Sequence, residues 1–267
     1  MEEKRQTQCY RRLLVLNMSC IEHIKHSCTK VGATGVFLNF ERIKADNRIF
    51  RALSPQDWAA WLPHLEPLTW DAGTVVAETT QPISHVVFPT QGVLTLQPAT
   101  LPGVNLGMIG REGLVNLAPS FDAAVKSYKV VAATSGEVCR LDATRLRAAM
   151  TESGEVLRLL LQYQHVLTSQ MTQTAVCRHH HTLEQQICRW LLMEMDWFEN
   201  HMRVMPTQLA TEFVGQRTED IKAVVHSLQE AFLIDCEWPR VSVSDREGLL
   251  RRCCDCYATI KREYQLL

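Results

Sequence analysis

The stretch MPTQLATEFVGQRTEDIKAVVHSLQEAFLI, from Met205 to Ile234, decides the fold. It predicts two short helices joined by a tight turn at Gly215, where a residue without a Cβ costs least. In the second helix, apolar residues recur at three-to-four spacing, so that one face packs against the first helix. They are Ile221, Val224, Val225 and Leu228. This layout is typical of a helix-turn-helix, whose second helix enters a DNA major groove, although a helical hairpin in a protein core has the same pattern.

The composition limits what the chain can be. A length of 267 residues is enough for two domains, and a net charge of −1 supplies no general attraction to nucleic acid. Any DNA contact must therefore use a local patch, although acidic and basic residues are nearly balanced between Arg203 and Arg262.

No apolar run is long enough to span a membrane, and no secretory signal is recognisable, so we expect a cytoplasmic protein with reduced cysteines. No nucleophile elbow, phosphate-binding glycine loop or zinc-protease helix is present, which argues against an enzyme.

Upstream of this stretch, the region from 66 to 142 has the pattern of a small β-barrel or jelly roll. Short β-branched or alternating runs are separated by turn signals such as Asp71–Gly73 and Pro102–Gly103. The predicted strands are Leu68–Trp70, Thr74–Val76, His85–Phe88, Gly92–Leu96, Gly107–Ile109, Ser127–Ala133 and Glu137–Leu141. A short helix capped by Ser54 precedes them.

Helices follow the predicted strands. Asp142 caps a short helix over Ala143–Met150, and a second helix follows over Leu183–Phe198. Between them, Glu155–Cys177 predicts a long amphipathic helix with a narrow apolar stripe, which suits a partner helix in a dimer; a core helix within the monomer is the alternative. The predicted dimer seam comprises Val156, Leu160, Tyr163, Leu167 and Gln170.

Beyond Ile234, residues Cys236–Ser244 predict a two-stranded wing around Pro239. Asp245 then caps a further helix over Arg246–Cys253, and the last residues close the chain.

Several segments, in this order, resemble the Crp/Fnr family of bacterial transcription regulators, in a branch common in rhizobia. They are HVVFPTQGVLTL at His85–Leu96, MIGREGL at Met108–Leu114, HHTLEQQICRWLL at His180–Leu192, the helix-turn-helix, and SDREGLLRRCCDCY at Ser244–Tyr257. The resemblance implies an α+β fold with a cyclic-nucleotide-binding-like β-roll, a long dimerisation helix and a C-terminal winged helix-turn-helix. We expect an N-terminal extension over 1–45, a β-roll sensor domain over 46–150, the dimerisation helix over 151–178 and the DNA-binding domain over 179–267.

The resemblance also implies a function. Members bind double-stranded DNA at pseudo-palindromic operators as homodimers and contact RNA polymerase. Alignment at Gly215 places Arg217, Thr218, Glu219, Lys222 and Ala223 on the face that family members use for DNA. We predict DNA contacts from the first four of these residues, and also from Thr207, Gln208, Gln216 and His226. Arg217 suits a bidentate contact to guanine, and Lys222 a phosphate. Thr218 and Ala223 replace arginines of cAMP-responsive members, so a module that has lost DNA reading is the alternative.

The sensor pocket departs from the cyclic-nucleotide pattern. The candidate pocket residues are Gly110, Arg111, Glu112, Lys126 and Ser127. Gly110 and Ser127 fit, but Arg111 replaces the glutamate that accepts from the ribose hydroxyl, and Lys126 replaces the arginine that grips the phosphate. We therefore expect no cAMP binding, no cofactor and an unknown effector.

Cysteines and histidines raise the question of a metal. Cys177 and His181 share one helix face, but no third and fourth ligand follows at metal-binding spacing, so no metal is predicted. Cys253, Cys254 and Cys256 suggest redox sensing or zinc, with structural packing as the favoured interpretation, since such a tail is usual in the branch that the chain resembles. Cys9, Cys20 and Cys28 are spaced too widely for an iron–sulfur ligand run.

Overall fold

A computed structural model describes residues 40–77, 84–100, 104–117, 128–197, 213, 216–237 and 240–267. The chain divides into two compact units, Met1–Lys44 and Ala45–Leu267. Of the first unit only residues 40–44 are described, so the predicted extension over 1–45 and its three cysteines lie almost wholly outside the described residues. The fold below is that of the second unit.

The helices in chain order are α3 (Phe40–Asp46), α4 (Arg48–Ala52), α5 (Pro55–Trp61), the 3-10 turn η2 (Leu62–His64), α6 (Ala143–Glu152), α7 (Gly154–His180), α8 (Leu183–Trp197), α10 (Thr218–Glu230), α11 (Arg246–Arg252) and α12 (Cys256–Gln265). The strands are β1 (Glu66–Trp70), β2 (Val75–Ala77), β3 (His85–Pro89), β4 (Leu94–Pro98), β5 (Gly107–Ile109), β6 (Tyr128–Ala132), β7 (Gly136–Asp142), β8 (Ile234–Glu237) and β9 (Arg240–Val243). None of the described helices is long and apolar enough to cross a membrane.

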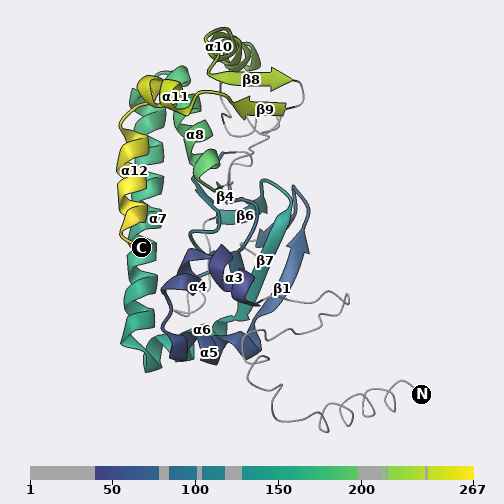
Figure 1. The fold of residues 1–267 in the computed structure, drawn as a ribbon, viewed down its shortest axis with the longest axis vertical. Helices are drawn as coiled ribbons and strands as arrows, with labels where there is room; N and C mark the ends of the chain where they lie inside the picture. Colours follow the sequence, from purple (N-terminus) through teal and green to yellow (C-terminus); the bar gives the residue numbers. More distant parts are fainter. Residues whose placement is uncertain are drawn as a thin grey trace, which may run out of the picture. The chain divides into compact units, whose positions relative to one another are not determined.

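The first seven strands form the β-roll (Figure 1). One antiparallel sheet has the order β1-β7-β3 and the other the order β2-β6-β4-β5. Gly92 turns the chain between β3 and β4 with a φ of 81°, a conformation that side chains disfavour. Each predicted strand corresponds to an observed one, and the mixed β-roll and helical architecture confirms the predicted fold class.

An aromatic cluster closes one end of the β-roll. Phe50 on α4 stacks on Phe88 of β3 with ring centroids 4.6 Å apart, and it also contacts Trp58 and Trp61 of α5. The buried Asn47 caps α4, and its amide donates to the carbonyls of Pro89 and Gly113 at 2.8 and 3.0 Å. The helices before the roll are thereby fixed to its strands.

The stripe predicted as a dimer seam on α7 faces the chain's own core. Its five residues are all buried within the monomer, from Leu160 at 0% to Leu167 at 8% exposure. The Tyr163 hydroxyl donates to the Leu114 carbonyl at 2.7 Å, and the Gln170 amide bonds both backbone groups of Met108 at 3.0 Å. Tyr163 and Gln170 thus contact the β-roll, and all five side chains are buried within the chain itself. The alternative interpretation, a core helix, describes this face.

Helix α12 lies alongside α7 (Figure 1). Gln170 donates to the hydroxyl of Tyr264 at 3.3 Å, and Arg48 donates to the Tyr264 carbonyl at 2.6 Å. Tyr264 of α12 therefore joins α4 to α7.

The core around α8 in the C-terminal part is continuous with the β-roll and α7, which contribute Val93, Met108 and Val166 to it. Buried residues from α8, α10, α11, α12 and the wing share one cluster, including Ile187, Leu191, Leu228, Val241 and Leu249. Strands β8 and β9 pair antiparallel from Ile234–Val243 to Glu237–Arg240, as the wing prediction requires.

Candidate functional site

Helix α10 has one buried and one exposed face. Ile221 and Leu228 are buried, and Val224 and Val225 pack partly buried against the same core. The exposed positions lie at the helix beginning and along the outer side: Gln216, Arg217, Thr218, Glu219, Lys222 and His226. Six of the eight predicted DNA-contacting residues therefore share one accessible surface, which we call the α10 face.

The α10 face carries a mixed charge. Arg217, at the N-cap position, makes a bidentate ion pair with Asp220, with Nε–Oδ2 and Nη2–Oδ1 distances of 2.9 and 2.8 Å. His226 Nε2 lies 3.3 Å from Glu230 Oε1. The Asp220 carboxylate raises the pKa of Arg217, and the guanidinium lowers the pKa of Asp220. Because both side chains are exposed, this pair is weakly held and can be exchanged for an external partner.

The first helix of the predicted helix-turn-helix falls outside the described residues, apart from Phe213. Thr207 and Gln208 lie in that part, as does Gly215. Phe213 is buried, and its ring lies edge-on to Trp190 of α8 with centroids 6.4 Å apart. The side chain just before the predicted turn thus enters the core on which α10 also packs.

Of the predicted effector residues, the structure describes Gly110, Arg111 and Glu112, whereas Lys126 and Ser127 lie outside the described part. Glu112 is turned inward, where its Oε1 accepts from the Gly110 N–H at 2.8 Å. Its Oε2 is buried with no hydrogen-bond partner, and burial raises the pKa of Glu112 to about 7. This carboxyl is therefore a buried polar group beside α7 and α12 rather than an exposed ligand contact.

A cavity of about 360 Å³ lies between the β-roll and α7. Its lining is mostly aliphatic, including Leu96, Ile109 and Leu114, with polar atoms from Tyr128 and Gln164. None of the three described effector candidates lines it. Sequence reasoning missed this space because strand and helix patterns show which residues turn inward but not where packing leaves a gap.

A thiol–imidazole cluster lies where α7 ends and α12 begins. It contains Cys177, His181, Cys254 and Cys256, whose Sγ and imidazole nitrogen atoms all lie within 4.8 Å of one another. The Cys177 and Cys254 sulfurs are 3.6 Å apart, and Cys256 Sγ is 3.5 Å from His181 Nδ1. Hydrogen bonding with Cys177 lowers the pKa of Cys254 and raises that of Cys177.

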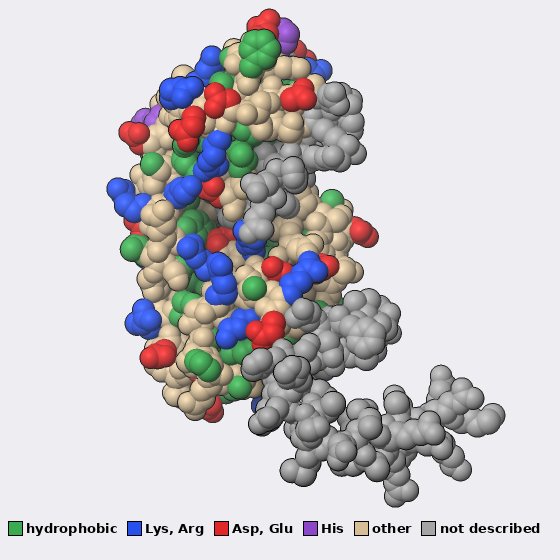
Figure 2. Space-filling model, viewed as in Figure 1, with side chains coloured by type: hydrophobic (Ala, Val, Ile, Leu, Met, Phe, Trp, Pro, Cys, Tyr) green, Lys and Arg blue, Asp and Glu red, His purple; other side chains and the backbone are tan. Residues whose placement is uncertain are grey.

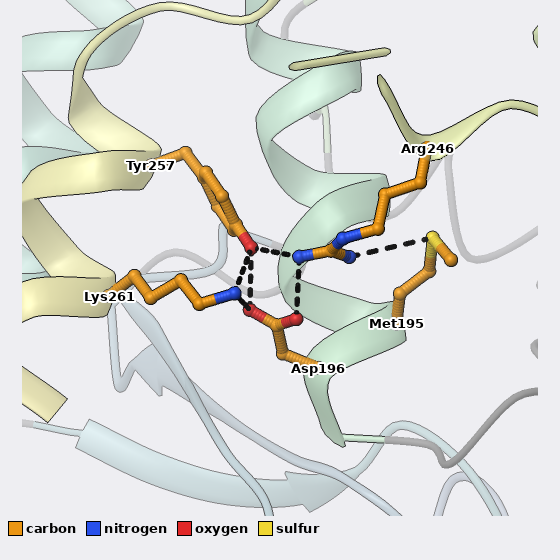
Figure 3. Close-up of polar contacts among 5 residues, drawn as sticks. All are labelled: Met195, Asp196, Arg246, Tyr257 and Lys261. Carbon is orange, nitrogen blue, oxygen red and sulfur yellow. Dashed lines mark hydrogen bonds and ion pairs between the residues drawn. The ribbon is translucent and has the colours of Figure 1, made fainter. Parts of the chain in front are cut away.

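A polar cluster holds α8, α11 and α12 together (Figure 3). Tyr257 donates to Asp196 Oδ2 at 2.7 Å and accepts from Lys261 at 3.0 Å. Arg246 donates to Asp196 Oδ1 at 2.9 Å and also bonds the Tyr257 hydroxyl. The two helices after the wing are thus fixed to the core helix on which α10 packs.

The surface seen in Figure 2 carries lysine, arginine and acidic side chains intermingled over the same face. This agrees with the net charge of −1. The described residues on the face drawn therefore form no broad basic surface.

Comparison of the sequence with protein-family models finds no match, and comparison with curated proteins finds none either.

Comparison with solved structures finds several transcription regulators of similar fold. FixK2 from Bradyrhizobium japonicum matches with a TM-score of 0.60 and 9% identity, over 71% of this chain and 98% of that one. A Crp/Fnr-family transcriptional regulator from Eubacterium rectale ATCC 33656 matches with a TM-score of 0.59 and 13% identity, over 78% and 98%. The c-di-GMP-responsive global regulator CLP of Xanthomonas campestris matches with a TM-score of 0.57 and 16% identity, over 71% and 99%. The fold is therefore the one predicted from the resemblance to Crp/Fnr regulators, while the rhizobial branch stays a prediction.

Proposed function

We propose that this protein, which has the fold of Crp/Fnr transcription regulators, is itself a regulator that binds DNA sequence-specifically as a homodimer without requiring cAMP. The observation that carries the proposal is the two-sided α10, which has a core face and a polar outer face and is followed by a paired wing. That is the arrangement in which a recognition helix presents its N-terminal residues to base edges.

The α10 face suggests a division of roles. Arg217 is 78% exposed at the helix beginning, and its fork suits the O6 and N7 acceptors of guanine. Glu219 suits a cytosine amino group, and Lys222 a phosphate. Binding requires Arg217 to exchange the Asp220 carboxylate for a base, which costs little because the pair is solvated.

The dimer contact is proposed for the outer side of α7, since the inner stripe is occupied. Exposed residues recur there at alternating four-and-three spacing: Leu161, His165, Thr168, Thr172 and Ala175. A heptad-like repeat of this kind suits a parallel partner helix, although its largely polar character predicts a weak seam. Thr168→Glu, which sets two carboxylates face to face across the seam, should shift the sedimentation coefficient toward that of the monomer.

Independence from cAMP rests on two features. Arg111 offers no acceptor for a ribose hydroxyl, and the neighbouring Glu112 carboxylate is buried on the Gly110 backbone. The cavity beside α7 is lined mainly by aliphatic side chains, which suits an apolar effector better than a cyclic phosphate. Titration calorimetry with cAMP should show no binding heat, and a saturable isotherm would contradict this part of the proposal.

The deciding experiment is selection from a genomic DNA library at several salt concentrations. The wild type should enrich a pseudo-palindromic sequence, with half-sites separated by ~34 Å, about one helical turn. Arg217→Ala should abolish the enrichment, whereas Arg158→Ala, which removes an exposed arginine of α7, should preserve it.

One observation favours a second candidate function, a ligand-binding or protein-interaction module whose helix-turn-helix no longer binds DNA. The Asp220 carboxylate already pairs with the Arg217 guanidinium. Helix α10 also carries three acidic side chains, Glu219, Asp220 and Glu230, but only one lysine, Lys222. Absence of DNA binding by the wild type even at low salt would favour this candidate and reject the regulator.

A further inference from the structure

We propose that Cys177, His181, Cys254 and Cys256 bind one zinc ion in a structural, four-coordinate site. The four residues come from two segments that only the fold brings together, with Cys177 and Cys254 separated by 77 positions in the chain. The proposal does not depend on DNA binding, because it concerns a different part of the molecule.

Two of the six distances between ligand atoms match the edges of a tetrahedron around one ion. Zinc bonds of about 2.3 Å to sulfur and about 2.0 Å to nitrogen give edges of roughly 3.8 Å between two sulfurs and roughly 3.5 Å between sulfur and nitrogen. The observed separations are 3.6 Å for Cys177–Cys254 and 3.5 Å for Cys256–His181. No pair of ligand atoms is more than 4.8 Å apart, which leaves room for a single ion but not for a multi-iron cluster.

The backbone holds the ligands in place. Cys177 lies in the last turn of α7, and the N–H of His181, the C-cap residue, donates to the Cys177 carbonyl at 3.1 Å. Residues four apart on a helix share a face, so the thiol and the imidazole project together. Cys256 is the first residue of α12, and Cys254 lies two positions before it. Three of the four ligands are buried, as in structural zinc sites.

A buried arginine supplies the charge that such a site needs. Arg189 of α8 is only 4% exposed. Its guanidinium donates hydrogen bonds to the Thr174 hydroxyl and to the Met193 sulfur, both of which are uncharged. Its Nε has no hydrogen-bond partner. The guanidinium also lies within electrostatic range of the Cys177 and Cys256 sulfurs. Three thiolates and a neutral imidazole around Zn²⁺ carry a net charge of −1, and a nearby arginine neutralises it.

Other uses of these thiols fit less well. A disulfide joins two sulfurs and explains neither the third thiol nor His181, which lies closest to Cys256. Cys139, Cys188 and Cys236 are also free cysteines, but they do not belong to the four-residue group. The chain's cysteines therefore do not all gather in one place, and the group of four is a specific arrangement.

The position of the site indicates what the ion does. His181 stands between α7, which packs on the β-roll, and α8, which forms the core under α10. A zinc ion there fixes the junction of the two helices to the beginning of α12 and limits how far the recognition helix can move relative to the sensor domain.

The test uses the full chain purified from cells grown with zinc. Elemental analysis should find one zinc per chain, and X-ray absorption should show sulfur neighbours at about 2.3 Å and nitrogen at about 2.0 Å. After zinc removal, Co²⁺ should give a thiolate charge-transfer band and the spectrum of a tetrahedral ion. Cys254→Ser and His181→Ala should lose the metal.

Two controls keep the proposal falsifiable. Cys253→Ser, beside the group but outside it, and Cys236→Ser in the wing should retain full zinc content. If Cys254→Ser fails to fold, Co²⁺ loading of the wild type still decides. A wild-type chain that binds neither zinc nor Co²⁺, an iron–sulfur spectrum instead, or equal metal content in Cys254→Ser would each overturn the proposal.

Discussion

The buried carboxyl of Glu112 makes stability depend on pH in an unusual direction. Burial raises its pKa in the folded chain from an ordinary value of 4.5 to about 7, although the Gly110 N–H and the charge of Arg48 act in the opposite sense. Between these two values the folded state holds a proton that the unfolded state has released. Stability therefore falls as pH rises through this window, whereas most carboxylates contribute in the other direction.

The size of the effect follows from the same two values. A folded pKa of about 7 against an unfolded 4.5 corresponds to a loss of ~3 kcal/mol of unfolding free energy between pH 4.5 and pH 7. Glu112→Gln resembles the protonated side chain, keeps an oxygen for the Gly110 N–H and cannot ionise. The variant should therefore match the wild type at the acidic end and exceed its stability above pH 7.

Urea unfolding at pH 5.0 and pH 7.5, followed by circular dichroism, measures this difference. Glu152→Gln, which removes an exposed carboxylate at the end of α6, is the matched control and should keep the pH dependence of the wild type. Equal pH dependence in the wild type and Glu112→Gln would refute the assignment of the effect to this carboxyl.

Three further predictions follow from other contacts. Leu160→Ala empties a fully buried position and should lower the unfolding free energy by about 2–5 kcal/mol without changing the dimer dissociation constant measured by sedimentation. Tyr257→Phe removes the hydroxyl that joins Asp196 to Lys261 and should cost about 1–2 kcal/mol in urea unfolding; an unchanged midpoint would show that this hydroxyl adds nothing to stability. Asp220→Asn releases the Arg217 fork and should strengthen DNA binding severalfold in fluorescence anisotropy, and weaker binding would contradict the proposed exchange of partners.

The sequence predicted the β-roll well because its signals are local. The run His85–Phe88 is followed by Pro89 and Gly92, which are turn signals; the observed β3 ends at Pro89, and β4 begins after Gly92. The N-cap of α6 was also predicted correctly, because a cap depends on residues that are close in the sequence. The Asp142 side chain accepts from the Thr144 N–H at the beginning of this helix.

The predictions that need long-range contacts did less well. The spacing of Leu160 and Tyr163 showed a buried stripe on α7, but spacing alone does not tell a partner chain from the chain's own strands and α12. In the sequence, Cys177 with His181, and Cys254 with Cys256, are separate candidates, but no local pattern shows that the fold brings the two pairs together. The polar cluster around Asp196 was missed too, since no local pattern pairs α8 with α11 and α12.

The packing of α12 on α7 has a consequence for synthesis of the chain. Cys254 emerges from the ribosome 77 residues after Cys177, an interval of about 4 to 15 seconds at bacterial or eukaryotic elongation rates. During that time the inner face of α7 can pack on the β-roll. The hydrogen bond from Gln170 to Tyr264 cannot yet form, and Cys177 and His181 cannot yet meet Cys254 and Cys256. Synthesis of the chain therefore imposes an order: the β-roll has been made before the contacts between α7 and α12 can form.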